Sequence, residues 1–278
     1  MEWVIEAEDV YYEYEGGGLA LDGVTLRVAK GEILAIMGEN GAGKTTLVKH
    51  FNGLLKPQRG RVVVLGMDTR HTPVSVLARH VGIVFQNPDF QLFAETVEDE
   101  IKFALRNFGF PEDVIEKRAK WALKIFGLEK YRERSPYALS IGERKRLSIA
   151  AVLSYDPDIV ILDEPTSGQD FLQKERLAEL LYLMKQQGKT VIIVTHDVEF
   201  AVRRSDRIVV MKAGKILGEG PPKKVLSDVR LIKEARLKPP QIIETAHSLT
   251  SKGVIVSKDI YPATPYELIR ALGLGEDI

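Results

Sequence analysis

The chain contains short runs of consecutive apolar residues, separated by segments in which apolar residues recur at helical spacing. The runs have the length of buried strands and lie at residues 31–38, 60–66, 80–86, 158–164 and 189–196. Uninterrupted apolar runs are typical of parallel strands that are covered on both faces. The pattern therefore predicts an α/β fold with a mainly parallel core sheet.

Other stretches predict smaller units around this sheet. Within residues 4–28, short apolar stretches flank three consecutive glycines, which indicates an N-terminal antiparallel β subdomain. Apolar spacing near 3.6 residues predicts helices at 45–55 and 172–187 and a helical subdomain at about 88–157. Residues 207–220 are expected to form a closing hairpin.

The last part of the sequence contains two pairs of prolines, at residues 221–222 and 239–240. The two amphipathic pieces that follow, at 241–251 and 264–272, are too short to form a core alone. We expect residues 1–222 to form the main domain and residues 223–278 to form a small C-terminal extension. The extension is expected to pack on that domain or on a partner.

Composition narrows the classes of function. The 278 residues include 39 Lys+Arg and 39 Asp+Glu, so the formal net charge is zero, which disfavours a nucleic-acid partner. The absence of cysteine excludes disulfides, thiolate metal sites and a cysteine nucleophile, and it fits a reduced compartment. No apolar run has the roughly 20 residues of a spanning helix, and the acidic N-terminus does not resemble a secretory signal. We expect a cytoplasmic protein whose membrane role, if it has one, is peripheral.

The sequence GENGAGKT at residues 38–45 matches the pattern G-x-x-x-x-G-K-[ST] between an apolar strand and a helix. This context predicts a phosphate-binding loop rather than an ordinary tight turn. Lys44 is expected to reach the β- and γ-phosphates of a nucleotide, and Thr45 to offer its hydroxyl to Mg²⁺. The expected nucleotide-binding residues of this segment are Gly38, Glu39, Asn40, Gly41, Ala42, Gly43, Lys44, Thr45 and Thr46.

Two adjacent carboxylates, Asp163 and Glu164, end an apolar strand that is expected to lie beside this loop. Strand-end carboxylates often only cap the next element. Together with the glycine loop, however, they suit phosphoryl transfer, in which one carboxylate holds Mg²⁺ and a second orients or deprotonates the attacking water. We assign the metal role to Asp163 and the water role to Glu164.

Three further positions allow a functional and a structural interpretation. His196 ends the next apolar run and either reaches the γ-phosphate or is a half-exposed polar residue. Gln86 follows the run at 80–86 and either binds Mg²⁺ or water or simply faces solvent. Ser140 precedes a basic helix, where it either starts a second phosphate site or forms a capping box with Glu143.

In this order, GENGAGKT, Gln86, LSIGE, IVILDE, SGQD and His196 resemble the nucleotide-binding subunit of ATP-binding cassette transporters over about residues 2–222. The resemblance implies a P-loop NTPase cassette with a helical signature subdomain, working as a dimer in which each ATP site is completed by the other protomer. It implies that Lys44, Glu164 and His196 are catalytic, with Glu164 as general base. The other implied roles are adenine stacking for Tyr14, the metal-linked Q-loop for Gln86, an inter-protomer loop for Asp170, and a signature acting in trans for Ser140, Gly142 and Glu143.

Within that family, QNPDFQLF at residues 86–93 is similar to the extended Q-loop of energy-coupling factor ATPases, which power uptake of vitamins or of cobalt and nickel ions. Residues 237–249 are similar to the C-terminal extension that contributes to the dimer contact of those ATPases. The resemblance implies a sister ATPase protomer, a transmembrane coupling protein and a substrate-binding membrane protein as partners, at the cytoplasmic face of the membrane. The groove for the coupling protein is expected to include Gln91, Leu92 and Phe93.

The signature departs from the family pattern at two positions. Ile141 stands where Gly is usual, and Glu143 stands where Gln is usual. Gln169 also replaces the common Leu of the loop at 167–170. These changes are compatible with a heterodimer whose two sites differ, and they leave open whether both sites hydrolyse ATP.

A cassette of this kind also occurs in proteins with other functions. A soluble ATPase acting on DNA or ribosomes is disfavoured by the neutral charge and by a single cassette without heptad repeats. A nucleotide-sensing subunit without turnover is disfavoured by the presence of Glu164 and His196. An exporter ATPase is often fused to its membrane domain, whereas this cassette is free. The sequence does not identify the transported substrate.

Overall fold

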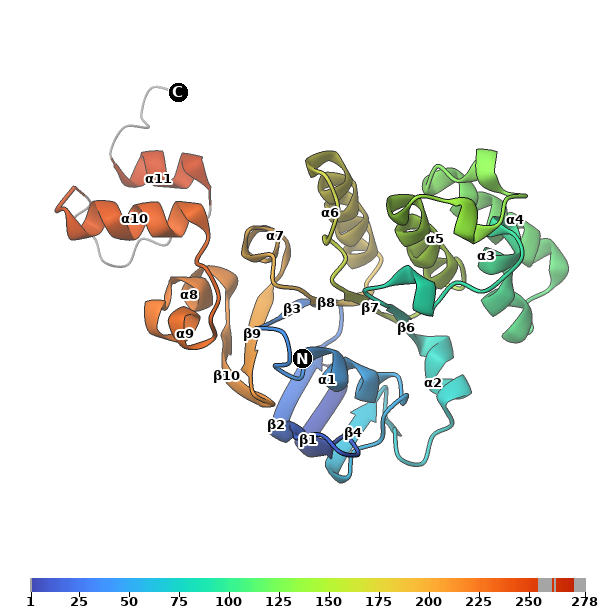
Figure 1. Cartoon of the computed structure of the whole chain (residues 1–278), viewed down its shortest axis with the longest axis horizontal. Coiled ribbons are helices and arrows are strands. Elements are labelled where there is room, and N and C mark those ends of the chain that lie inside the picture. Colours follow the sequence, from blue (N-terminus) through green and yellow to red (C-terminus); the bar gives the residue numbers. More distant parts are fainter. Residues whose placement is uncertain (1, 255–261, 263, 273–278) are drawn as a thin grey trace.

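A six-stranded sheet forms the centre of the protein in a computed structural model that describes residues 2–254, 262 and 264–272 (Figure 1). Neighbouring strands of the sheet are parallel from β9 to β6, and β10 pairs antiparallel with β9. Every residue of β3, β7 and β8 is buried, as the uninterrupted apolar runs predict. In spatial order the strands are β10 (Lys215–Gly220), β9 (Arg207–Lys212), β3 (Ile33–Met37), β8 (Thr190–Val194), β7 (Ile159–Asp163) and β6 (Val81–Val84).

A second, antiparallel sheet lies beside the first and contains the predicted N-terminal hairpin. Its order is β2 (Leu19–Ala29), β1 (Trp3–Glu13), β4 (Arg59–Val64) and β5 (Met67–Asp68). Helix α1 (Lys44–Phe51) packs between the two sheets, because its buried face joins one apolar cluster with residues of both. The helix ends four residues before the predicted Leu55, since Asn52 caps it and Gly53 takes a positive φ of 76°.

Three α-helices occupy the segment that the sequence predicts as a helical subdomain, at about 88–157. It comprises α3 (Val97–Asn107), α4 (Glu112–Ile125) and α5 (Ile141–Ser154), with short turns η1 (Pro88–Phe90), η2 (Glu129–Tyr131) and η3 (Pro136–Ala138). Its own apolar cluster includes Leu92, Ile101 and Leu123. Helix α2 (Val74–His80) precedes β6 and was not predicted, because it is short and buries only Leu77.

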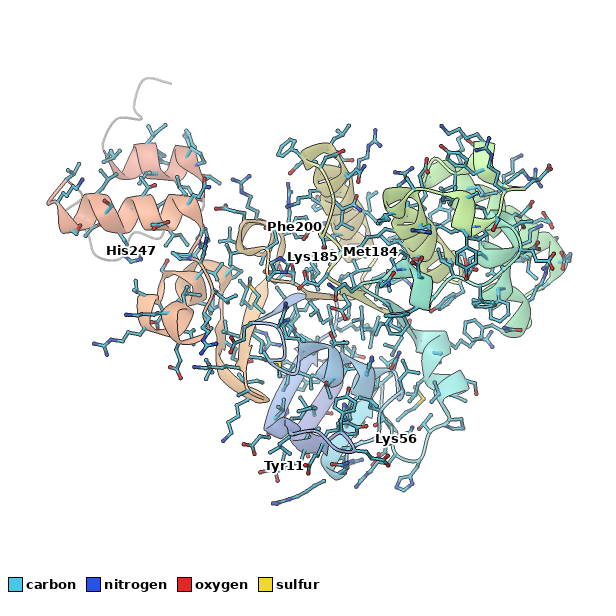
Figure 2. The ribbon with its side chains drawn as sticks, viewed as in Figure 1. Tyr11, Lys56, Met184, Lys185, Phe200 and His247 are labelled. Atoms are coloured by element: carbon cyan, nitrogen blue, oxygen red, sulfur yellow. The ribbon has the colours of Figure 1, made fainter. Side chains whose placement is uncertain are left out.

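Helices α6 (Phe171–Gln186) and α7 (Val198–Arg204) follow β7 and β8, respectively. Met184 of α6 and Phe200 of α7, both labelled in Figure 2, belong to an apolar cluster with residues of β3, β7 and β8. The helical stretch predicted at 172–187 agrees with the bounds of α6 to within one residue at each end. Together with the buried face of α1, these helices give the core sheet a cover on both faces.

The C-terminal part contains two pairs of helices that pack in different places. Helices α8 (Pro222–Ser227) and α9 (Val229–Glu234) bury Val225, Leu226 and Ile232 against apolar residues of β3 and β9. Helices α10 (Gln241–Ser251) and α11 (Pro265–Ala271) coincide closely with the two predicted amphipathic pieces and project from the central sheet (Figure 1). The start of α10 buries Ile243 in the cluster of α8 and α9, and α10 packs on α11 through Ala246 and Leu268. The remaining parts of the predicted extension, 255–261, 263 and 273–278, lie outside the described residues. Among the described helices, none combines the length and the apolar content that crossing a bilayer requires.

Candidate active site

A pocket of about 570 Å³ opens at the carboxyl ends of β3 and β7. In an α/β sheet this edge is where ligands commonly bind. The pocket brings together most of the residues that the sequence assigned to nucleotide and metal. Its lining includes Tyr14, Asn40, Gly41, Ala42, Gly43, Lys44, Thr45, Thr46, Gln86, Asp163 and Glu164.

The glycine loop between β3 and α1 adopts a backbone shape that side chains would obstruct. Gly38 has φ 150°, and a Cβ there would lie 2.2 Å from the carbonyl oxygen of Met211. Gly43 has φ 97°, and a Cβ there would lie 2.4 Å from the carbonyl oxygen of Ala20. Helix α1 starts directly after this loop with no side-chain cap, so its first N–H groups face the pocket as an anion-binding end.

The side chain of Lys44 folds back over the loop from the first turn of α1. Its Nζ donates hydrogen bonds to the carbonyl oxygens of Gly38 and Glu39, at 2.8 and 2.9 Å. Burial lowers the pKa of Lys44, while the negative charges of Glu164, Asp163 and Glu39 oppose that shift. The ammonium is therefore fixed against the backbone of the glycine loop.

Thr45 and Asp163 meet across the pocket floor. The Thr45 hydroxyl donates to Oδ2 of Asp163 at 2.8 Å. Asp163 is 3% exposed, and burial raises its pKa, with a further rise from Glu164 and opposing effects from the Thr45 hydrogen bond and from Lys44. A hydroxyl, a carboxylate and the nearby amide of Gln86 are hard oxygen donors of the kind that Mg²⁺ prefers. The residues present thus fit a magnesium ion.

Glu164 is held in an unusual conformation directly after β7. Its φ is 48°, in the left-handed region, which costs a non-glycine residue about 1–3 kcal/mol and is typical of functional sites. Its N–H donates to the carbonyl oxygen of Val194 at 2.8 Å, and its Oε2 lies 2.9 Å from Nδ1 of His196. His196 does not line the pocket itself, yet this contact places it beside the carboxylate that does.

Tyr14 lies at the edge of the same pocket, in the segment between β1 and β2. Its hydroxyl is 3.2 Å from the hydroxyl of Thr46, and its ring meets Tyr12 edge to face with centroids 5.0 Å apart. The Tyr14 ring is 42% exposed, so part of it is accessible for stacking on a planar ligand.

The start of α5 lies outside the pocket of its own chain. Ser140 and Glu143 form the capping box that the structural interpretation predicted: the Ser140 hydroxyl accepts the N–H of Glu143, and Glu143 Oε2 accepts the N–H of Ser140 at 2.9 Å. Hydrogen bonds from the Tyr131 hydroxyl and then from Ser140 lower the pKa of Glu143 to about 2. Glu143 is therefore turned onto the helix cap, and the Ile141 side chain is 66% exposed.

Burial removes one residue, Leu92, from the predicted partner groove. Leu92 is 2% exposed and belongs to the core of the helical subdomain. Gln91 is engaged internally, because its Nε2 donates to the carbonyl oxygen of Ser148 at 3.0 Å. Phe93 is 57% exposed and meets Phe103 of α3 edge to face, with centroids 4.5 Å apart.

The exposed surface at this place is an aromatic patch formed by Phe93 and Phe103, which are 57% and 44% exposed. Phe90, three residues before Phe93 in the chain, is 82% exposed. Glu100 fixes the loop that carries Phe93, because its buried carboxylate accepts the N–H groups of Phe93 and Ala94 at 2.8 Å each. Phe103 was missed by sequence reasoning, although an aromatic residue on the polar face of an amphipathic helix is a usable signal.

Two more residues complete the surroundings. Asp170, expected at the contact between protomers, caps α6 by accepting the N–H of Gln173 at 2.8 Å. Lys145 of α5 was not predicted to contribute, yet it is 3% exposed and its Nζ donates a short hydrogen bond to the carbonyl oxygen of Glu164.

Comparisons with known proteins agree with this geometry. The family model described as ABC transporter matches residues 21–167. The energy-coupling factor transporter ATP-binding protein EcfA of Methanocaldococcus jannaschii is 41% identical over 252 residues, which is 90% of each chain. The solved structure of cbiO1 from Clostridium perfringens, part of the ABC transporter complex cbiONQ, has 37% identity and a TM-score of 0.74, covering 89% of this chain and 100% of that one. A dimeric ATP-binding cassette in a post-hydrolysis state, bound to ADP and phosphate, has 31% identity and a TM-score of 0.72, covering 78% of this chain and 98% of that one.

Proposed function

The chain belongs to the ABC transporter family as an ATPase cassette, and we propose that it powers an energy-coupling factor importer for a vitamin or for a cobalt or nickel ion. The observation that carries the proposal is the convergence of Lys44, Thr45, Asp163 and Glu164 in one pocket at the glycine loop. The relatives' names support the importer class: one is an energy-coupling factor transporter ATP-binding protein, and another is part of the ABC transporter complex cbiONQ.

Binding of ATP rests on the loop and on Tyr14. Backbone N–H groups of the loop and of the first turn of α1 bind the phosphates, Lys44 neutralises their charge, and the exposed Tyr14 ring stacks on adenine. Thr45, Asp163 and Gln86 would hold Mg²⁺, which when bound neutralises charge that develops on the phosphates.

Hydrolysis depends on Glu164. Its carboxylate accepts the proton of a water molecule as the water oxygen attacks the γ-phosphorus, and the bond to the ADP oxygen breaks. His196 positions this carboxylate through the 2.9 Å contact with its Oε2. The backbone of Glu164 is tied to β8 through Val194, so the base is fixed before the reaction begins.

A second protomer completes each site in this proposal. Ser140 and Gly142 begin a helix that does not line the pocket of its own chain, so we assign the N–H groups of this helix start to ATP bound to a partner protomer. The exposed Ile141 side chain leaves the backbone of Gly142 open on the helix end. Residues 223–278, with α10 and α11 standing clear of the core sheet, would add to the dimer contact.

The aromatic patch of Phe93 and Phe103 is the surface that we assign to a transmembrane coupling protein. Exposed aromatic residues that lie together are typical of docking sites for a partner helix. The patch is joined to the nucleotide pocket through the segment that begins with Gln86. Through this contact the protein would act peripherally at the cytoplasmic face of the membrane, beside a membrane protein that binds the transported substrate.

We expect the double change Phe93→Ser and Phe103→Ser to weaken binding to a purified energy-coupling factor transmembrane subunit by about tenfold or more, because both rings would be buried on docking. The measurement is binding of the detergent-solubilised subunit to immobilised ATPase, with solution mass in ATP as a check that the variant is folded. Tyr182→Ser, which removes a 61% exposed aromatic from α6, is the matched control and should bind like the wild type. Equal affinity for all three proteins would contradict the assignment of the patch.

A further inference from the structure

Lys145 is a buried cation that the mechanism above does not use. It lies on α5 with 3% of its surface exposed, and burial lowers its pKa while the charges of Glu164 and Asp163 oppose that shift. A lysine is rarely buried without a specific partner, because removing its charge from water is costly. In the part of the chain that the structure describes, the acceptor of its ammonium is the backbone carbonyl of Glu164.

This hydrogen bond acts on the residue that carries the general base. The Glu164 backbone has a positive φ, its N–H is bound to Val194 of the neighbouring segment, and its carbonyl is bound to Lys145. The two bonds hold the peptide groups on either side of the Cα atom, so they determine where the side chain leaves the backbone. The same carbonyl also accepts the Ser167 N–H, at 3.3 Å, so Lys145 is its charged donor and Ser167 its backbone donor. Without Lys145 the carbonyl would keep only the longer, uncharged bond, and the carboxylate would be less firmly aligned with the reacting water.

Lys145 also lies on the helix that begins with the signature residues. Ser140 caps this helix, and Lys145 follows five residues later on the same continuous α-helix. A shift of the helix start is therefore transmitted to the Glu164 carbonyl through one hydrogen bond. In the proposed dimer, the helix start contacts ATP bound to the partner, whereas Glu164 acts on ATP bound to its own chain.

We propose that Lys145 is a positioning residue that links the signature helix to the general base and so couples the two ATP sites of the dimer. The inference rests on the proposed function, because it assumes that Ser140 and Gly142 contact ATP across the dimer. Lys145 does not line the nucleotide pocket, and it acts through the backbone of Glu164.

The space around Lys145 can accommodate an uncharged side chain of similar length. The residue borders a cavity of about 340 Å³ that is also lined by apolar residues such as Ile149 and Leu177. Methionine has a similar length and no charge, so Lys145→Met fits this space while it removes the donor to Glu164. Arginine retains both charge and donors, so Lys145→Arg tests the hydrogen bond itself.

The first experiment measures kcat and KM for ATP hydrolysis. The mass of the protein in solution with ATP shows whether the dimer forms. Lys145→Met is expected to lower kcat by about 100-fold while KM stays near the wild-type value and the ATP-dependent dimer still forms. Lys145→Arg should restore much of the rate. Lys124→Met is the matched control, because Lys124 borders the same cavity from the end of α4, and it should behave like the wild type. A Lys145→Met protein with the wild-type kcat would overturn the proposal.

The second experiment separates this proposal from the proposed function. Hydrogen exchange in the absence of nucleotide, measured by mass spectrometry, reports directly on how often the backbone hydrogen bonds of residues 159–170 open. Lys145→Met should speed exchange of the Glu164 amide region, whereas Lys124→Met should not. If the wild type neither hydrolyses ATP nor dimerises, the proposed function and the coupling of sites fail together. Unchanged exchange in a Lys145→Met protein would show instead that Lys145 does not hold this backbone.

Discussion

Replacing Glu164 with Gln is expected to lower single-turnover ATP hydrolysis by about 10²–10⁴-fold, the usual contribution of a positioned general base. Glutamine has the same shape and keeps a polar contact with His196, but it cannot accept the proton of the attacking water. The change also removes one negative charge from a buried site beside the phosphate loop. We therefore expect the ATP-bound dimer to accumulate in this variant, since binding is retained and hydrolysis is lost.

The measurement combines rapid-quench hydrolysis with solution mass in ATP and Mg²⁺. Glu175→Gln is a suitable control, because Glu175 is a glutamate of α6 that pairs with Arg204 outside the nucleotide pocket. This control should hydrolyse ATP like the wild type. If Glu164→Gln hydrolysed ATP at the wild-type rate, another group would have to act as the base.

Replacing Lys44 with Met is expected to weaken ATP binding by about 100-fold. The ammonium lies over the phosphate loop, held by the carbonyl oxygens of Gly38 and Glu39, and a charged hydrogen bond lost in a buried site costs about 1.5–3 kcal/mol. The fold should survive, because the side chain is 7% exposed and methionine is readily buried.

Titration calorimetry with ATP and Mg²⁺ measures this effect, and thermal unfolding checks the fold. Lys49→Met provides the control on the same helix, since Lys49 lies outside the lining of the pocket. Binding by Lys44→Met within threefold of the wild-type Kd would show that the ammonium does not contact phosphate.

Much of the fold can be predicted from the sequence, because the central strands of the core sheet are buried on both faces and therefore appear as uninterrupted apolar runs. The runs that contain β3, β7 and β8 were identified in this way, and the helical subdomain was identified by its periodicity. Short helices with few buried positions escaped detection, as α2 shows. Proline at 221–222 marked the end of β10, yet it did not reveal that α8 and α9 pack on the core sheet.

The site was predictable where chemistry depends on local spacing. The glycine loop and the Asp163–Glu164 pair each lie within one short segment, and the structure places both in one pocket. The contact of Lys145 with Glu164 depends on tertiary packing between α5 and the end of β7, so no local pattern shows it. The groove prediction was wrong at Leu92 for a related reason: an apolar residue in a loop can belong to the core of a neighbouring subdomain.

The central claim is that each ATP site is built from two chains, and mixing two inactive variants tests it most directly. Glu164→Gln lacks the base but keeps the signature. Gly142→Asp keeps the base but places a negative charge at the signature, and it should fold because a Cβ at Gly142 meets only the Gln173 side chain, at 3.8 Å. Each variant alone should hydrolyse ATP slowly, because both of its sites lack one part.

A mixed dimer contains one site with the base of the Gly142→Asp chain and the signature of the Glu164→Gln chain. Signature donors to the γ-phosphate are expected to contribute about 10²-fold to the rate, so mixing should raise hydrolysis far above the sum of the separate variants. The measurement is the steady-state rate of ATP hydrolysis as the ratio of the two variants is varied, and the account predicts a maximum near equal amounts. A rate that equals the sum of the two variants at every ratio would contradict a site shared between two chains.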